Sequence, residues 1–320
     1  MIRVGIVGCG AVAQQMYART LPPVANVVVS HVCDRDPAAA DELARRLDAQ
    51  SVSLSEAIQA CDAIIVATPP SSHYELCRTS LQAGRTVVCE KPLVGSLAEA
   101  TDLLESAKSS GGALYVGHFR RMFPVVQEVR KLIATGMLGA VQSISVIEGG
   151  RYSWAVQSDY ITSDPIGGVL FDTGSHTLDM ALFACGLDET VLRTSVTDVW
   201  RDRSEPSHEL KAKAQVYADS QQIDLEIHLS RYQALANRIR IELQHGRIDV
   251  PVGLHNSFRL TGKSNSTVVR VEDGDANYVD CFRMQWESIF GSAPDKTFEA
   301  RRFLGLTSIL EAISRKPQSP

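Results

Sequence analysis

A glycine-rich turn near the N-terminus constrains the fold more than any other feature of this chain. The apolar run 4–7 is typical of a short buried strand, and the sequence GCGAVA at 8–13 follows it directly. Gly8 permits a tight turn, Gly10 lets the backbone approach a pyrophosphate at the free amides of the next helix, and Ala13 replaces the usual third glycine. The predicted cofactor contacts in this turn are Gly8, Gly10, Ala11 and Val12. As an alternative, the glycines serve only the packing of a plain strand–turn–helix unit.

An acidic residue follows the second apolar run. Asp34 lies 24 residues after Gly10 and can accept two hydrogen bonds from an adenosine ribose, while it would repel the 2′-phosphate of NADP. These properties favour NAD as the cofactor. The adjacent Arg35 is also a predicted cofactor contact and could accommodate that phosphate, so NADP stays open. A turn or helix-capping role for Asp34 is the alternative.

Strand and helix signals alternate over the first 120 or so residues. Asp36 and Ser96 are typical N-cap residues, and a helix over 71–83 ends at Gly84. The predicted strands are 4–7, 27–33, 63–67, 86–89 and 113–116. Such alternation with short connections predicts a parallel sheet with helices on both faces.

The pattern changes after about residue 120. Helices are predicted at 125–135, 167–185 and about 298–314, and strands at 141–148, 192–200, 211–217, 223–229, 238–243, 247–250 and 268–271. Strict alternation in 223–229 leaves one sheet face for solvent or a partner. We predict an α/β protein with a dinucleotide-binding Rossmann domain at 1–120 and an α+β substrate-binding domain with an antiparallel sheet at 121–320. The helix at about 298–314 could pack back near the first domain.

The composition excludes several classes of function. The net charge of −5 and the lack of a long basic block argue against a nucleic-acid partner. The sequence contains no run of about 18 apolar residues, so we predict no membrane span. The N-terminus lacks the pattern of a signal peptide. The seven cysteines are scattered without a CxxC pair, which favours reduced thiols and a cytoplasmic location.

Three further motifs resemble one known family. They are CEKPL at 89–93, ATPPSSH at 67–73 and IGGVLFDTGSHTLD at 166–179. Together with the glycine turn and Asp34, they resemble the glucose–fructose oxidoreductase, inositol dehydrogenase and rhizopine-catabolism family (Gfo/Idh/MocA). The resemblance covers essentially the whole chain and implies a Rossmann domain followed by an α+β domain with an open, mostly antiparallel sheet. It also implies an NAD(P)-dependent oxidoreductase of sugars, cyclitols or their derivatives, and a homodimer or homotetramer formed through that sheet.

The resemblance also implies roles for individual residues. It places Lys91 at the substrate hydroxyl and the cofactor, and Glu90 near the nicotinamide ribose. Thr68, Pro69 and His73 are the expected contacts on the nicotinamide side, and Arg121 is an expected substrate contact. Two positions depart from the family pattern, because Phe119 stands where asparagine is common and Ile166 replaces the first of three glycines.

The helix predicted at 167–185 carries the expected acid–base residues. Asp172, His176 and Asp179 share one face of an α-helix. Oxidation of a carbinol needs a base that titrates near neutral pH, which favours His176, with Asp172 orienting the imidazole or the substrate. Lys91 would stabilise the developing alkoxide, and the alternative gives the proton transfer to Lys91 itself. Hydride transfer to nicotinamide needs no metal, and we predict none.

Simpler interpretations remain for these residues. Lys91 could be a surface lysine, and His176 a histidine satisfied within the core. Tyr152 and Trp154 lie in a loop before this helix and are predicted to contact a sugar ring, although they could equally pack the loop. The leading hypothesis is a sugar or cyclitol dehydrogenase or ketoreductase. The alternatives are an NAD-dependent redox glycoside hydrolase and a non-catalytic NAD-binding regulator.

Overall fold

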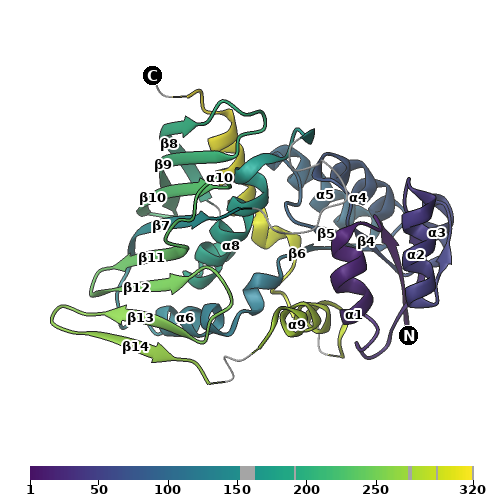
Figure 1. Ribbon diagram of the computed structural model, residues 1–320, viewed down its shortest axis with the longest axis horizontal. Helices are drawn as coiled ribbons and strands as arrows, with labels where there is room; N and C mark the ends of the chain where they lie inside the picture. Colours follow the sequence, from purple (N-terminus) through teal and green to yellow (C-terminus); the bar gives the residue numbers. More distant parts are fainter. Residues whose placement is uncertain (152–162, 191, 273–275, 293–294, 319–320) are drawn as a thin grey trace. The chain divides into compact units, whose positions relative to one another are not determined.

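The computed structural model describes the chain except residues 152–162, 191, 273–275, 293–294 and 319–320. Its described residues form two compact units (Figure 1). Of the described residues, unit 1 contains those within 1–119 and 278–301, and unit 2 contains those within 120–151, 163–277 and 302–318. Among the described helices, none combines the length and the apolar character that a membrane span requires.

Unit 1 is built on a parallel sheet in the order β3-β2-β1-β4-β5-β6. Its strands are β1 (Ile2–Val7), β2 (Val27–Cys33), β3 (Gln50–Ser51), β4 (Ala63–Val66), β5 (Thr86–Glu90) and β6 (Ala113–Gly117). Its helices are α1 (Ala18–Thr20), α2 (Pro37–Leu47), α3 (Leu54–Ala60), α4 (His73–Gln82), α5 (Leu97–Ser110) and α9 (Tyr278–Phe290). The strand order reverses between β1 and β4, and ligands of such sheets bind outside the carboxyl ends of the strands at that point.

Local sequence explains these elements. All four residues of β4 are fully buried, as a strand covered on both faces requires. The Asp36 side chain accepts from the Ala38 amide and caps α2, and the Ser96 hydroxyl accepts from the Glu99 amide and caps α5. The predicted parallel sheet is confirmed.

Unit 2 is built on an eight-stranded sheet in the order β14-β13-β12-β11-β7-β10-β9-β8. Its strands are β7 (Val141–Gly149), β8 (Leu192–Arg201), β9 (Glu209–Ala218), β10 (Gln221–Ser230), β11 (Arg238–Leu243), β12 (Gly246–Pro251), β13 (Ser257–Thr261) and β14 (Ser266–Arg270). Neighbours pair antiparallel except β7 and β10, which run parallel. The sheet is therefore mostly antiparallel, as expected, but mixed.

Helices cover one face of this sheet. They are α6 (Pro124–Ala134), α8 (Ser175–Ala184) and α10 (Leu304–Arg315). Helix α8 contacts β7 and β11, α6 packs on α8, and α10 packs on β8 and α8. The last helix, expected at about 298–314, is α10; it starts at Leu304 and belongs to unit 2. The helix that joins unit 1 late in the chain is α9, which packs on α1.

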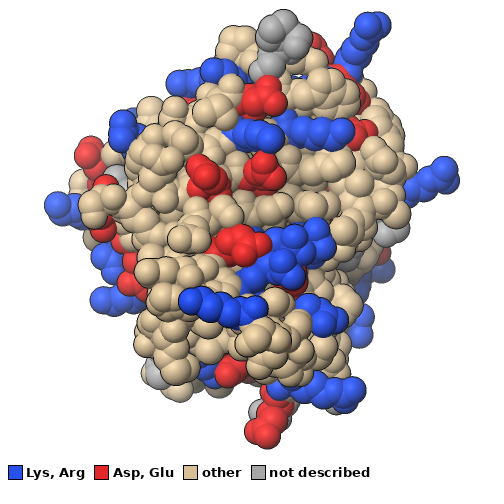
Figure 2. All heavy atoms as spheres, turned by 90° about the vertical axis from the view of Figure 1, so that its left-hand side faces the viewer, with Lys and Arg blue, Asp and Glu red and all other residues tan. Residues whose placement is uncertain are grey.

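The other face of the sheet carries polar side chains. Along β10, Ile223, Leu225 and Ile227 are buried while Asp224 and Glu226 are exposed. Charges of both signs are interspersed on the side shown in Figure 2. Neighbouring strands pair them: the Lys213 ammonium lies 3.1 Å from the Glu226 carboxylate. Within unit 2, no described helix covers this face of the sheet.

Candidate functional site

The glycine turn has the geometry that a dinucleotide requires. Gly8 has φ +100°, and a Cβ there would lie 2.5 Å from the Ala67 carbonyl oxygen, so a side chain is excluded. A Cβ on Gly10 would meet nothing within 4 Å, which leaves this position open for a phosphate. The helical segment that follows contains a π turn, Ala13–Tyr17, before α1. This geometry is compatible with a pyrophosphate at Gly8, Gly10, Ala11 and Val12, which stay the predicted contacts.

Asp34 is fixed against this turn. One carboxylate oxygen accepts from the Cys9 amide at 2.6 Å, and the other accepts from the Asp36 amide at 2.8 Å. Each oxygen has a second lone pair, so the carboxylate can also accept from a ribose. Burial, with the Asp34 charge as a smaller cause, raises the pKa of the Cys9 thiol to about 12. The thiol therefore stays neutral and adds no negative charge where phosphates would bind.

The Glu90-Lys91-Pro92 segment begins at the carboxyl end of β5. Tyr17 donates its hydroxyl to the Glu90 carboxylate, whose other oxygen accepts from the Lys91 amide at 3.0 Å. Burial raises the pKa of the Glu90 carboxyl, although the Tyr17 hydroxyl and the Lys91 charge act in the opposite direction. In this parallel sheet β5 pairs with β4, and β4 pairs with β1. Lys91 follows the carboxyl end of β5 and the glycine turn follows the carboxyl end of β1, so both lie at the same edge of the sheet. Lys91 itself is partly exposed.

His73 holds two loops of this edge together. Its Nε2 lies 2.9 Å from the Thr68 carbonyl oxygen, and its Nδ1 lies 2.8 Å from the Pro92 carbonyl oxygen. The side chain is fully buried. A direct cofactor contact by His73 is therefore not supported, and its contacts act on the loops instead. Thr68 and Pro69 lie at the end of β4, and Thr68 accepts from the Ser72 hydroxyl at 2.7 Å.

The helix that carries His176 differs from the predicted regular α-helix. A π turn, Leu170–Gly174, precedes α8, and single π turns of this kind are frequent at functional sites. Within α8, whose residues are all described, His176 alone is partly exposed, and Asp172 is partly exposed in the π turn. A polar, accessible side chain on an otherwise buried helix favours a functional role for His176 over a satisfied core histidine.

Two arginine side chains stabilise this helix through contacts that the sequence did not predict. Arg231 donates to the Asp172 carboxylate at 2.5 Å. Next to His176, Thr177 donates its hydroxyl to the Glu148 carboxylate, which also accepts from Arg120 at 3.2 Å. These partners lie far apart in the sequence, so no local spacing could have pointed to them.

The described contacts of Arg121 lie within the core of unit 2. Its guanidinium donates to Asp179 at 2.6 Å and to Asp188 at 3.2 Å and stacks between the rings of Phe183 and Phe303. The residue is fully buried. A substrate contact by Arg121 is therefore not supported, and Asp179 serves this ion pair. Burial raises the pKa of the Asp179 carboxyl even though the Arg121 charge opposes the shift.

Two further observations concern the surroundings of the helix. Tyr152 and Trp154 lie outside the described residues, so their predicted sugar contacts stay predictions.

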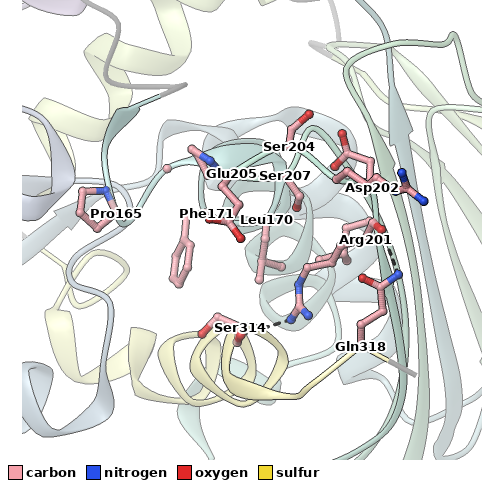
Figure 3. Close-up of a pocket in the computed structure, with 14 residues that line it drawn as sticks. Pro165, Leu170, Phe171, Arg201, Asp202, Ser204, Glu205, Ser207, Ser314 and Gln318 are labelled. Atoms are coloured by element: carbon pink, nitrogen blue, oxygen red, sulfur yellow. Dashed lines mark hydrogen bonds between the residues drawn. The ribbon is translucent and has the colours of Figure 1, made fainter. Parts of the chain in front are cut away.

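A cavity of about 510 Å³ in unit 2 is lined by the start of the π turn, the segment 201–207 and the end of α10 (Figure 3). Arg201 extends across it toward α10 and donates to the Lys316 carbonyl at 3.0 Å. None of the described site residues lines this cavity.

Comparison with known proteins places these features in one family. The model described as "Oxidoreductase family, NAD-binding Rossmann fold" matches residues 2–118, and the "GFO/IDH/MocA C-terminal domain" model matches residues 126–249. The chain is 29% identical to inositol 2-dehydrogenase of Rhizobium meliloti over 63% of this chain and 60% of that protein. It is 25% identical to glucose-6-phosphate 3-dehydrogenase of Bacillus subtilis over 88% of this chain and 80% of that protein. The aligned part thus spans less than two thirds of the first relative.

Solved structures show the same fold. The aldose-aldose oxidoreductase of Caulobacter crescentus superposes with a TM-score of 0.80 at 18% identity, covering 98% of this chain and 96% of that one. The WlbA dehydrogenase of Bordetella pertussis, in complex with NADH and UDP-GlcNAcA, superposes with a TM-score of 0.78 at 20% identity, covering 98% and 94%. Matches to both domain models, with the glycine turn and Glu90-Lys91-Pro92 in place, establish that the chain belongs to the Gfo/Idh/MocA family of NAD-binding oxidoreductases.

Proposed function

We propose that this protein is an NAD(P)-dependent dehydrogenase or ketoreductase that acts on a carbinol or keto carbon of a sugar, a cyclitol or a sugar derivative. The observation that carries the proposal is the position of Lys91. This lysine follows β5 at the sheet edge where the open Gly10 position and Asp34 would hold a dinucleotide. Relatives named inositol 2-dehydrogenase and glucose-6-phosphate 3-dehydrogenase support the substrate class.

The residues divide the chemistry between them. When bound, the nicotinamide supplies the hydride acceptor or donor. Lys91 stabilises the negative charge that develops on the substrate oxygen, and His176 takes up the hydroxyl proton during oxidation and returns it during reduction. Asp172 orients the imidazole or the substrate. Glu90, fixed by Tyr17, holds the Lys91 backbone in place.

A substrate panel tests the proposal. The purified protein is mixed with NAD or NADP and with polyols, cyclitols, sugars and nucleotide-linked sugars, and the absorbance of the reduced nicotinamide is followed. Substrate-dependent net reduction supports the proposal. Sugar release without net reduction would assign the redox glycoside hydrolase, and cofactor binding with neither reaction would assign the regulator; both results would overturn the proposal.

The choice between NAD and NADP gives a separate prediction. We propose NAD, because the Asp34 carboxylate would lie beside the 2′-position. Asp34→Asn removes the charge and keeps an acceptor for the Cys9 amide, so the ratio of kcat/KM for NAD over NADP should fall by about tenfold or more. Asp36→Asn changes the same charge two residues away and should leave the ratio unchanged. A wild type that already prefers NADP would contradict the assignment.

We also propose that the protein is a cytoplasmic homodimer or homotetramer that assembles through the uncovered face of the unit 2 sheet. Trp200 on β8 is 40% exposed there, and the Lys211 ammonium lies 5.3 Å from the centre of its ring. Large aromatic side chains are enriched at protein interfaces. Light scattering of wild type and Trp200→Glu tests this assembly: a monomeric wild type would contradict it. The described cysteines are free thiols, which supports the location.

A further inference from the structure

Arg231, which no sequence motif marked, forms an ion pair with Asp172 of the predicted site. The guanidinium nitrogen lies 2.5 Å from a carboxylate oxygen and donates to the Gly168 carbonyl oxygen at 3.4 Å. The side chains are only 7% and 13% exposed. From this geometry we infer that Arg231 is a positioning residue, which fixes the Asp172 carboxylate at the start of the helix that carries His176. The inference rests on the proposed function, because it assigns Asp172 to that reaction.

The sheet brings Arg231 to this helix. Strands β7 and β10 run parallel and end side by side at Gly149 and Ser230. The next residue is Arg231, whose amide donates to the His208 carbonyl oxygen at 2.9 Å. The base of the side chain is therefore fixed by the backbone of a neighbouring segment.

The π turn lies close against β10. A Cβ on Gly174 would lie 2.8 Å from the Leu229 methyl carbon Cδ1, so glycine permits this approach. The approach brings the turn within reach of a side chain that leaves the end of β10. Arg231 then joins two points of one segment, the carbonyl of Gly168 and the carboxylate of Asp172.

An arginine suits this position better than a lysine. Both contacts come from one guanidinium nitrogen, whose two N–H groups lie in the fixed plane of the guanidinium, whereas an ammonium supplies a point charge without that planar geometry. Removal of the arginine would leave the Asp172 carboxylate nearly buried without its ion-pair partner, and it would then rotate, take up a proton or recruit water. In each case its orientation toward the reacting groups changes.

A double-mutant cycle tests this assignment. Arg231→Met should lower kcat by about 10- to 100-fold with a smaller change in KM and an unchanged Kd for the dinucleotide, whose predicted residues lie in unit 1. Arg231→Lys should recover part of kcat. Because Arg231 acts through Asp172, adding Arg231→Met to Asp172→Asn should slow the enzyme little beyond Asp172→Asn alone. Independent losses that multiply in the double variant would overturn the inference.

A matched control and a second measurement separate this inference from a general loss of stability. Arg240→Met removes another arginine–aspartate pair of unit 2, with 2.8 Å between Arg240 and Asp249, and should leave kcat unchanged. Hydrogen exchange of the peptide 166–178 should rise in Arg231→Met and not in Arg240→Met, whether or not a substrate is known. A wild type without oxidoreductase activity would refute the proposed function and leave this exchange test standing. Unchanged exchange in Arg231→Met would refute the positioning role itself.

Discussion

Replacing Lys91 with methionine is expected to lower the turnover number by about 10²-fold or more, while the affinity for the dinucleotide stays nearly unchanged. The substitution removes the only group of this side chain that can stabilise a substrate alkoxide. It keeps the backbone amide that donates to Glu90 at 3.0 Å, so the loop should hold its conformation. Steady-state turnover and dinucleotide titration by fluorescence measure the two quantities.

Lys108→Met is the matched control for this variant. Lys108 is exposed on α5 of the same unit, so its loss should leave both quantities unchanged. A Lys91→Met enzyme with wild-type turnover would refute the assigned role. Loss of dinucleotide binding in that variant would show that Lys91 serves chiefly the cofactor.

The pH dependence of the Lys91→Met enzyme also distinguishes the two candidates for proton transfer. If His176 carries the proton, the pH profile of the residual oxidation should still show the ionisation of that base. His176→Gln should then abolish that ionisation. If Lys91 carries the proton, the ionisation should disappear in Lys91→Met and persist in His176→Gln.

Much of unit 1 could be predicted from the sequence because its signals are local. The strand predicted at 27–33 has the bounds of β2 (Val27–Cys33), and Asp36 caps α2 as expected. Helix α9 was missed although Cys281, Phe282, Gln285, Trp286 and Ile289 have helical spacing and are buried. Its place in unit 1 could not be predicted from that spacing, because its partners on α1 lie more than 250 residues away along the chain. Strand β13 was missed because only Phe258 and Leu260 mark its alternation.

Some residues of the candidate site could likewise be predicted from local motifs, and others could not. Gly8, Gly10, Asp34 and Lys91 belong to local motifs, and each follows a strand of unit 1 as the motif requires. The side chains that bind the predicted site residues are brought to them by the tertiary structure. Tyr17, which binds Glu90, and Arg231, which binds Asp172, carry no motif of their own. The family position of Arg121 predicts a substrate contact, whereas its described contacts lie in the core.

Substitution of Arg121 by methionine is expected to cost about 3–5 kcal/mol of folding free energy and to lower Tm by on the order of 10 °C. The variant keeps the volume between Phe183 and Phe303 roughly filled but leaves Asp179 buried without its cation. Asp188 keeps Arg130 and Arg302 at 2.8 Å. Asp179 therefore accounts for most of the expected loss, which calorimetry measures.

The loss should depend on pH because Asp179 can take up a proton. Its pKa is already raised by burial, and removal of the Arg121 charge raises it further. The folded variant then binds a proton that the unfolded chain releases above the ordinary aspartate value. Since stability falls with pH wherever the folded state binds more protons, the deficit relative to wild type should be larger at pH 8 than at pH 5. An equal deficit at both values would show that Asp179 does not titrate in the variant.

A second substitution separates this structural role from the substrate contact that the family resemblance implied. Replacing a buried ion pair by apolar groups of similar volume is often neutral, whereas removing one partner is costly. Arg121→Met combined with Asp179→Leu should therefore recover at least half of the lost stability. If Arg121 bound substrate, Arg121→Met would instead raise KM with little change in Tm, and the second substitution would restore neither. Recovery of Tm together with near-normal KM would place Arg121 in the core that supports the helix of His176.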